Sequence, residues 1–271
     1  MDETTRRGFA LVGPGRAGTT IAAALVAAGY RCVAVAGPPG SRSAERAASR
    51  FDAPVTTIPA AGRDADLVVL ATPDGSITAA AAQLAAGLRP GALVVHLAGT
   101  RGIDALAPIT DARDDVAVGA LHPLQTLTGD PGALEGSWAA VAGPPAVRHL
   151  ARALGLHAFA VAPDQRVAYH AAAAVASNHV VALLGQVERL AAHTGVPFEA
   201  FEPLVRRSVT NAFAAGPAAA LTGPVARGDV DTVSRHLDAI GHDEQRTYRA
   251  VADAARQLAR RDEPQLRQVL A

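Results

Sequence analysis

The chain has 271 residues, enough for two ordinary domains with a sizeable core, and nearly half of its residues are apolar. Zero formal charge argues against nucleic acid or an acidic membrane surface as a partner. A single cysteine, Cys32, excludes an internal disulfide and a cysteine-based metal cluster, so no metal site is expected. Apolar runs are interrupted at residues 177–179 and the N-terminus lacks a signal-peptide pattern, so we expect a cytoplasmic protein without a membrane span.

The first part of the chain alternates short apolar runs with helical patterns. Continuous apolar runs are typical of strands buried on both faces of a parallel sheet. Strands are predicted at residues 9–12, 32–36, 67–71, 93–97, 116–121, 138–142 and 158–161. Helices are predicted at residues 17–28, 43–50, 75–86 and about 146–154. This alternation predicts an α/β domain with a Rossmann-type doubly wound parallel sheet over residues 1–163.

After residue 163 the pattern becomes entirely helical. One long alanine-rich helix is predicted at residues 164–194, with an interruption near Ser177. Further helices are predicted at residues 199–215, 229–240 and 243–259, and a short one near the C-terminus. Glycines and prolines separate these patterns as stops and turns. Residues 164–271 are therefore predicted to form an all-helical second domain.

A glycine-rich turn follows the first strand and opens the first helix. It reads Gly13-Pro14-Gly15-Arg16-Ala17-Gly18. In a dinucleotide-binding turn the first glycine makes the bend, the second lets the backbone approach the pyrophosphate, and the third allows close helix–strand packing. A glycine-rich turn without a ligand is the alternative, but the strand before and the helix after it favour dinucleotide binding. Gly13, Gly15, Arg16, Ala17 and Gly18 are the predicted contacts.

The end of the second strand indicates which dinucleotide binds. An NAD enzyme is expected to carry an acidic residue about 20 residues after the glycine turn, and here no acid precedes Glu45. Ser41, Arg42 and Ser43 offer hydroxyl groups and a guanidinium that suit a 2′-phosphate. Ser41 is equally suited to cap the next helix, and both roles are compatible. The sequence favours NADP.

Two more strand ends carry candidate cofactor contacts, because ligands of such sheets lie outside the carboxyl ends of the strands. Thr72, Pro73 and Asp74 follow the third apolar strand, and His96 and Gly99 belong to the end of the fourth. Ordinary turn chemistry, including a helix cap by Asp74, explains these residues as well.

With these features and the strings HLAGT, LHPLQT, YHAAAAVASNH and ALTGPVARGD, about residues 8–260 resemble a known group. It comprises bacterial Rossmann-like proteins with a C-terminal domain of unknown function, within the superfamily that carries 6-phosphogluconate-dehydrogenase-like helical domains. Ketopantoate reductase, pyrroline-5-carboxylate reductase, hydroxyisobutyrate dehydrogenase and prephenate dehydrogenase are relatives. The resemblance implies a nucleotide domain, a helical domain that often builds a dimer, and a substrate cleft between them.

One departure from the resemblance concerns the proton donor. Hydroxyacid dehydrogenases and ketopantoate reductases use a lysine on the first long helix of the second domain, followed by an asparagine. Asn178 matches that asparagine, but Ala174 stands four residues before it, and the chain contains no lysine at all. The lysine mechanism therefore does not transfer to this chain.

Histidine is the best remaining proton donor, because its ordinary pKa lies near neutrality. His122, in the string LHPLQT, stands at a predicted strand end and is similar to the His-Pro motif of prephenate dehydrogenase. On the long helix, His170 lies seven and eight residues before Ser177 and Asn178, which places all three on a shared face. Hydrogen bonds to backbone, neighbouring helices or a dimer partner are the structural alternatives.

Asn211 and Arg227 complete the candidate substrate contacts. Arg227 has the bidentate geometry that suits a carboxylate, although a surface ion pair explains it equally well. Asp229 is predicted to cap the following helix.

The sequence thus predicts an NADP-dependent oxidoreductase that acts on a small carboxylate-bearing carbonyl or imine compound. The resemblance alone implies a ketopantoate-like 2-oxo acid as the leading substrate. His122, Ser177 and Asn178 are the catalytic candidates. The resemblance implies a homodimer through the helical domain. Two alternatives stay open: a non-catalytic NADP-binding sensor or partner-binding protein, and a deazaflavin-dependent NADP reductase.

Overall fold

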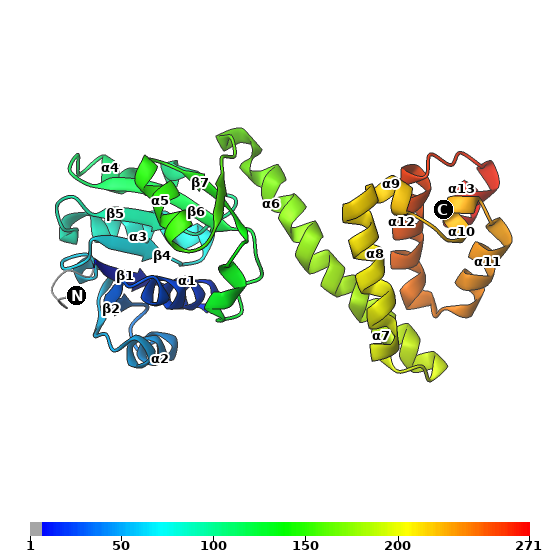
Figure 1. Cartoon of the computed structure of the whole chain (residues 1–271), viewed down its shortest axis with the longest axis horizontal. Helices are drawn as coiled ribbons and strands as arrows, with labels where there is room; N and C mark the ends of the chain where they lie inside the picture. The colour runs from blue at the N-terminus through cyan, green and yellow to red at the C-terminus, as the bar shows by residue number, and fades with distance from the viewer. Residues whose placement is uncertain (1–6) are drawn as a thin grey trace. The chain divides into compact units, whose positions relative to one another are not determined.

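The computed structural model describes residues 7–271. The chain divides into two compact units, residues 1–177 and 178–271. The sheet belongs to the first unit, and the second is built of helices (Figure 1). The division falls inside the long helix that follows the sheet, and the boundary at residue 163 stays a prediction.

The first unit is organised by one eight-stranded sheet in the order β3-β2-β1-β4-β5-β6-β7-β8. The strands are β1 (Gly8–Val12), β2 (Arg31–Ala36), β3 (Val55–Thr56), β4 (Leu67–Leu70), β5 (Leu93–His96), β6 (Ala117–Pro123), β7 (Trp138–Ala142) and β8 (His157–Phe159). The strand order reverses between β1 and β4, which is the switch point where ligands of such sheets bind. The Rossmann-type prediction is confirmed. Strand β3 was not predicted, because two residues are too short to show a periodicity.

The sheet departs from the predicted parallel arrangement at one pair of strands. Strands β6 and β7 are antiparallel, while every other neighbouring pair is parallel. Residues 124–137 join them with only a short 3₁₀ turn (Pro131–Leu134) and no α-helix. A connection without a crossover helix returns the chain in the opposite direction.

Alternate residues of β1 point to two separate cores. Phe9 and Leu11 pack with α1 (Arg16–Ala27), α2 (Arg42–Phe51) and α5 (Pro145–Ala153) on one face. Ala10 and Val12 pack with α3 (Ile77–Leu84) and the short α4 (Ala107–Thr110) on the other face. Because both faces are covered, the strands are apolar throughout, as their sequences indicate.

The long helix begins in the first unit and continues into the second. It consists of α6 (Arg166–Ala174), a π-helical turn (Val175–His179) and α7 (Val180–Thr194). The predicted interruption near Ser177 is therefore confirmed as a π-turn rather than a break. The other helices are α8 (Glu202–Ala215), α9 (Pro217–Ala220), α10 (Pro224–Arg227), α11 (Val230–Ala239), α12 (His242–Leu258) and α13 (Pro264–Leu270). A small core of Val225, Val233, Leu237, Ala252, Leu266 and Leu270 joins α10 to α13.

The long helical stretch also differs from one expectation. Within the described part of the chain, Pro163–Thr194 is the one helix that is long and apolar enough to cross a membrane by length and composition, with a mean hydropathy of 1.4. The polar residues at 177–179 do not lower that mean enough to exclude a span. None of its most apolar window is buried.

Candidate functional site

The three glycines of the turn after β1 have different surroundings. Gly13 has a φ of +86°, and a Cβ there would lie 2.7 Å from the backbone of Ala71 and Thr72. At Gly18 a Cβ would lie 2.6 Å from the carbonyl oxygen of Gly13. Among residues 7–271, apart from its immediate chain neighbours, no atom lies within 4 Å of a Cβ placed on Gly15. The outer two glycines are therefore required by packing, whereas the middle one leaves open space beside the N-terminus of α1.

The start of α1 is free to bind an anion. Gly15 caps it without a side-chain hydrogen bond, and its first turn contains no acidic residue. Exposed N–H groups at a helix N-terminus bind phosphate groups, and the helix dipole adds to the attraction. The glycine turn therefore has both the space and the donors that a pyrophosphate needs.

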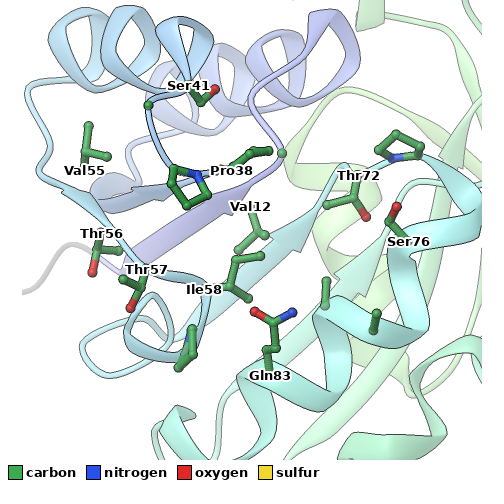
Figure 2. A pocket seen from close by; sticks show the side chains of 18 of the residues that line it. Val12, Pro38, Ser41, Val55, Thr56, Thr57, Ile58, Thr72, Ser76 and Gln83 are labelled. Carbon is green, nitrogen blue, oxygen red and sulfur yellow. The ribbon is translucent and has the colours of Figure 1, made fainter.

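A cavity of about 1180 Å³ lies beside this turn. Figure 2 shows its apolar wall, which includes Val12, Pro38 and Ile58. Thr72 also lines it, and its Oγ1 is buried without a hydrogen-bond partner among the described residues. A buried hydroxyl without a partner costs free energy, which a ligand in the cavity would recover. The cavity therefore fits an adenosine moiety, with Thr72 as a hydrogen-bonding contact.

Ser41, in the segment after β2, caps the helix that follows it. Ser41 Oγ accepts a hydrogen bond of 3.3 Å from the backbone N–H of Ala44 and shares one of 2.9 Å with Ser43 Oγ. Ser41 thus caps α2, as its alternative role predicted. Arg42 is exposed at the start of α2.

A second hollow, of about 490 Å³, lies between the glycine turn and α2. It is lined by Pro14, Gly15, Arg16, Thr19, Ser43, Arg46, Ala47 and Arg50. Its lining contains three arginines and no acidic residue, so its electrostatic potential favours an anion. Arg46 and Arg50 were not predicted from the sequence. Their spacing of four residues on the α2 helix was the available signal.

The turns after β4 and β5 are joined by a hydrogen bond. Thr100 Oγ1 donates to Asp74 Oδ2 over 2.6 Å. Asp74 therefore binds Thr100 and does not cap a helix, since no side-chain cap is present at its turn. Pro73 precedes it and lines the large cavity with Thr72.

His96 has a different role from the predicted cofactor contact. It is fully buried at the end of β5, its Nδ1 accepts from the N–H of Ala98 over 3.2 Å, and its Nε2 lies 2.9 Å from the carbonyl oxygen of Gly102. Burial lowers its pKa, so the ring is neutral and Nε2 donates. Its side chain shapes the turn that carries Gly99 and has no exposed edge for a ligand.

His122, His170 and Gly99 lie together at the carboxyl ends of β5 and β6. A Cβ on Gly99 would lie 2.4 Å from His170 Cδ2 and 2.8 Å from His122 Nε2. The two imidazole rings are 5.7 Å apart. Gly99 is thus required here for the approach of both rings. The structure brings together three residues that the sequence named in separate roles, and those roles stay predictions.

The pKa of His122 is lowered to about 4, mainly by burial and then by the nearby charges of His170 and Arg166. The ring is therefore neutral at neutral pH. Its Nδ1 is hydrogen-bonded to the hydroxyl of Tyr169 over 2.8 Å. No protein group among residues 7–271 hydrogen-bonds to Nε2. The nitrogen that faces Gly99 is the one available to a substrate.

Two residues beside this cluster were not predicted as site residues. Tyr169 immediately precedes His170 on α6, and Arg166 lies one turn earlier and is only 1% exposed. Arg166 Nη2 donates to the carbonyl oxygen of Ala98 over 3.2 Å. The sequence signal was their spacing on one helix face, which shows only when α6 is placed against β5 and β6.

The remaining candidates lie further along the chain. Ser177 and Asn178 lie in the π-turn, where Ser177 Oγ donates to the carbonyl oxygen of Ala173 over 2.8 Å. Asn211 lies on α8 and Arg227 ends α10, both in the second unit. Their catalytic and substrate-binding roles stay predictions. The predicted cap by Asp229 is confirmed, since its carboxylate accepts from the N–H of Thr232 over 3.0 Å.

No group of three or more His, Cys, Asp or Glu side chains that could hold a metal ion occurs among the residues the structure describes.

Comparisons with solved structures place the fold among dinucleotide enzymes. A candidate NADP oxidoreductase from Bacteroides fragilis superposes with a TM-score of 0.78 at 22% identity, covering 93% of this chain and 98% of its own. A Thermotoga maritima protein superposes with a TM-score of 0.72 at 21% identity, covering 93% and 99%. Pyrroline carboxylate reductase from Plasmodium falciparum with NADP bound superposes with a TM-score of 0.62 at 13% identity, covering 96% and 100%. The chain therefore shares the fold of NAD(P)-dependent oxidoreductases.

Comparison with curated proteins finds no match. Family models match two parts of the chain. Residues 3–123 match a Rossmann-like domain, and residues 132–255 match a domain of unknown function, DUF2520. The chain is thus a Rossmann-like domain followed by a DUF2520 domain.

Proposed function

We propose that the protein is an NADP-dependent oxidoreductase that transfers a hydride between NADP(H) and a small carboxylate-bearing carbonyl or imine compound. The observation that carries the proposal is the position of His122 Nε2. This nitrogen has no protein partner among residues 7–271 and faces Gly99 at the strand ends where the nicotinamide of a Rossmann-bound dinucleotide is expected. Carbonyl reduction requires at least a hydride donor and a proton donor that lie close together.

Bound NADP(H) would supply or accept the hydride. The backbone at Gly15 and the first N–H groups of α1 would hold its pyrophosphate, and Thr72 Oγ1 would hydrogen-bond the adenosine part. His122 Nε2 would give a proton to the substrate oxygen or nitrogen during reduction and take it back during oxidation.

NADP is favoured over NAD by the arginine-lined hollow. Arg16, Ser43 and Arg46 line it beside the glycine turn, where guanidinium groups suit a 2′-phosphate. The competing feature is Glu45, which lines the large cavity and offers a carboxylate to a ribose hydroxyl. Arg46→Ala is expected to weaken NADPH binding about tenfold and to leave NADH binding unchanged, because only the 2′-phosphate is lost as a partner.

The experiment that tests the cofactor assignment is a titration of the protein with NADPH and with NADH, followed by nicotinamide fluorescence and thermal stabilisation. Tight NADPH binding with weaker NADH binding supports the proposal and directs a screen of 2-oxo acids and cyclic imines for NADPH consumption. Tighter NADH binding would assign the site to NAD through Glu45. Binding of neither would remove the oxidoreductase proposal.

For the substrate we keep a ketopantoate-like 2-oxo acid as the leading candidate and His170, Asn211 and Arg227 as its predicted contacts. Arg227→Ala is expected to raise KM without changing kcat, because a carboxylate clamp binds ground state and transition state alike. Unchanged kinetics would remove Arg227 from the site.

A non-catalytic NADP-binding sensor is the second candidate, and the absence of any lysine favours it. Measurement of NADPH consumption in the compound screen distinguishes the sensor from the enzyme. A sensor binds NADPH without consuming it in the presence of any compound of the screen, whereas the enzyme oxidises it.

We further propose that the protein is cytoplasmic and that the helical unit pairs with a second copy. Val181 on α7 and Leu204 and Phe213 on α8 are 66%, 65% and 90% exposed, so two consecutive helices present large apolar side chains that a second copy would cover. On α7, Arg189 forms an ion pair with Glu244 of α12, a polar contact that suits a protein surface better than lipid. Phe213→Glu is expected to convert a dimer to a monomer in light scattering. A monomeric wild-type protein that binds lipid vesicles would contradict the proposal.

A further inference from the structure

Tyr169 holds the Nδ1 side of the His122 ring in place. Its hydroxyl lies 2.8 Å from Nδ1, and the two rings meet edge to face with centroids 5.5 Å apart. Phe159 packs against the same tyrosine ring at 5.7 Å. The phenol is therefore held in place on the side of the imidazole that is opposite the available nitrogen.

A phenol leaves both neutral forms of the imidazole open. When the Tyr169 hydroxyl donates to Nδ1, the proton of the ring sits on Nε2 and can be given to a substrate. When the hydroxyl accepts from Nδ1–H, Nε2 is a free base. A carboxylate, which only accepts, would lock one tautomer. The pair can thus pass a proton in either direction.

Arg166 supplies a buried cation next to this pair. It precedes Tyr169 by three residues on α6, so the two side chains share one face of the helix. One of its nitrogens, Nη2, binds the carbonyl oxygen of Ala98, while Nε and Nη1 are buried with no hydrogen-bond partner among the described residues. The charge of Asp104 favours the cationic form of Arg166, but among the described residues no hydrogen bond joins the two side chains. A buried guanidinium normally pairs with an anion.

We propose that Tyr169 is the proton source for the reaction and acts through His122, and that Arg166 is the cation that stabilises the tyrosinate this transfer leaves behind. The inference rests on the proposed oxidoreductase function and answers the absence of a lysine donor.

For a carbonyl substrate, bound NADPH would supply the hydride that the carbonyl carbon receives, and the carbonyl π-electrons would become an alkoxide lone pair. The alkoxide takes the proton from His122 Nε2, while Nδ1 takes the proton from the Tyr169 hydroxyl. The products are an alcohol, NADP⁺, neutral His122 and tyrosinate, and water later returns a proton to the tyrosinate.

The charges around His122 explain why the ring must relay a proton and not carry an extra one. Burial, together with His170 and Arg166 on α6 and His96 on β5, lowers its pKa to about 4, while the carboxylate of Asp74 in the turn after β4 acts in the opposite direction. A cationic His122 is therefore scarce at neutral pH. The positive charge of Arg166 also lowers the pKa of Tyr169, against the larger opposite effect of burial.

The test measures the ionisation of Tyr169 directly and needs no substrate. The chain contains only three tyrosines. In a Tyr30→Phe/Tyr248→Phe background, fluorinated tyrosine incorporated throughout the protein labels Tyr169 alone and makes the phenol acidic enough to titrate in the neutral range by ¹⁹F NMR. Arg166→Gln is expected to lower the acid dissociation constant of the Tyr169 phenol at least tenfold, because the nearby positive charge is lost. Arg166→Lys, which keeps that charge, is expected to restore most of this constant. An Arg166→Gln titration that matches the parent would overturn the proposal.

A second measurement covers the case in which Arg166→Gln does not fold. Tyr169→Phe removes one oxygen from an edge-to-face contact, so it should leave NADPH affinity unchanged while kcat for a substrate from the screen falls about 100-fold and its pH profile changes shape. A fall of less than threefold with an unchanged pH profile would show a merely structural tyrosine. Failure of the proposed function appears separately, as absence of NADPH binding in the parent protein.

Discussion

The two ends of the candidate site are built from the chain in different ways. At the glycine turn, the parts lie within a few residues of one another, and the turn and the helix that follows it form one continuous segment. At the His122 cluster, the hydrogen bond to Tyr169 joins residues 47 positions apart. A site built from neighbouring residues can be recognised as a sequence motif. A site made by long-range packing is visible in the sequence only as isolated polar residues within apolar strands and helices.

The largest expected effect separates the two roles that glycine plays in the first site. Gly13→Ala places a Cβ 2.7 Å from backbone atoms at a positive φ, so we expect a loss of at least about 3 kcal/mol in the free energy of unfolding. Gly15→Ala meets nothing within 4 Å and should change stability by less than about 0.5 kcal/mol. Urea unfolding measures both.

Measurement of NADPH affinity further separates the roles of Gly13 and Gly15. Gly15→Ala is expected to weaken NADPH binding about 100-fold, because its methyl group occupies the space where the backbone approaches the pyrophosphate. A stable Gly15→Ala protein with parental affinity would contradict the assignment of this turn to a dinucleotide.

The second site is tested by the same kind of substitution at Gly99. Gly99→Ala brings a Cβ within 2.4 Å of His170 and 2.8 Å of His122, and both rings must move. Displacement of a proton carrier by about 1 Å costs up to about 100-fold in turnover. We expect that loss in NADPH consumption, with NADPH affinity within threefold of the parent. Equal turnover would show that the cluster does not face the reaction.

Much of the first unit could be predicted because its signals are local. The apolar runs located seven of the eight strands, and the glycine turn indicated the edge of the sheet where ligands bind. The strand β7 was located but its antiparallel direction was not predicted, since strand direction depends on whether a crossover helix forms between residues 124 and 137. Arg166 and Tyr169 were missed for a related reason: their neighbours His122 and Ala98 belong to β6 and to the turn after β5, and helix periodicity carries no information about either.

The pH dependence of stability reports on the second site. The pKa of His122 is about 4 in the folded protein against an ordinary value of 6.5. Between these values the unfolded chain binds a proton that the folded chain does not, so the stability present above pH 6.5 is lost as the pH falls toward 4. From pH 7 to 5 we expect the parent to lose about 2 kcal/mol more than His122→Asn in urea unfolding. Parallel curves for the two proteins would show that His122 is solvated like a surface histidine.

The smallest expected effect is that of Ser41→Ala, which tests whether Ser41 only caps α2 or also binds the cofactor. Ser41 Oγ accepts from the N–H of Ala44, so Ser41→Ala should cost about 1 kcal/mol in the free energy of unfolding. If capping is its role, the ratio of NADPH to NADH affinity stays constant, whereas a tenfold fall in that ratio would show that the hydroxyl also binds the 2′-phosphate. Asp229→Ala is the matched control, because it removes a cap of the same kind from α11 in the second unit and should leave both affinities unchanged. Because the hydroxyl of Ser43 bonds to Ser41 and lines the arginine hollow, Ser43→Ala should lower that ratio where Ser41→Ala does not.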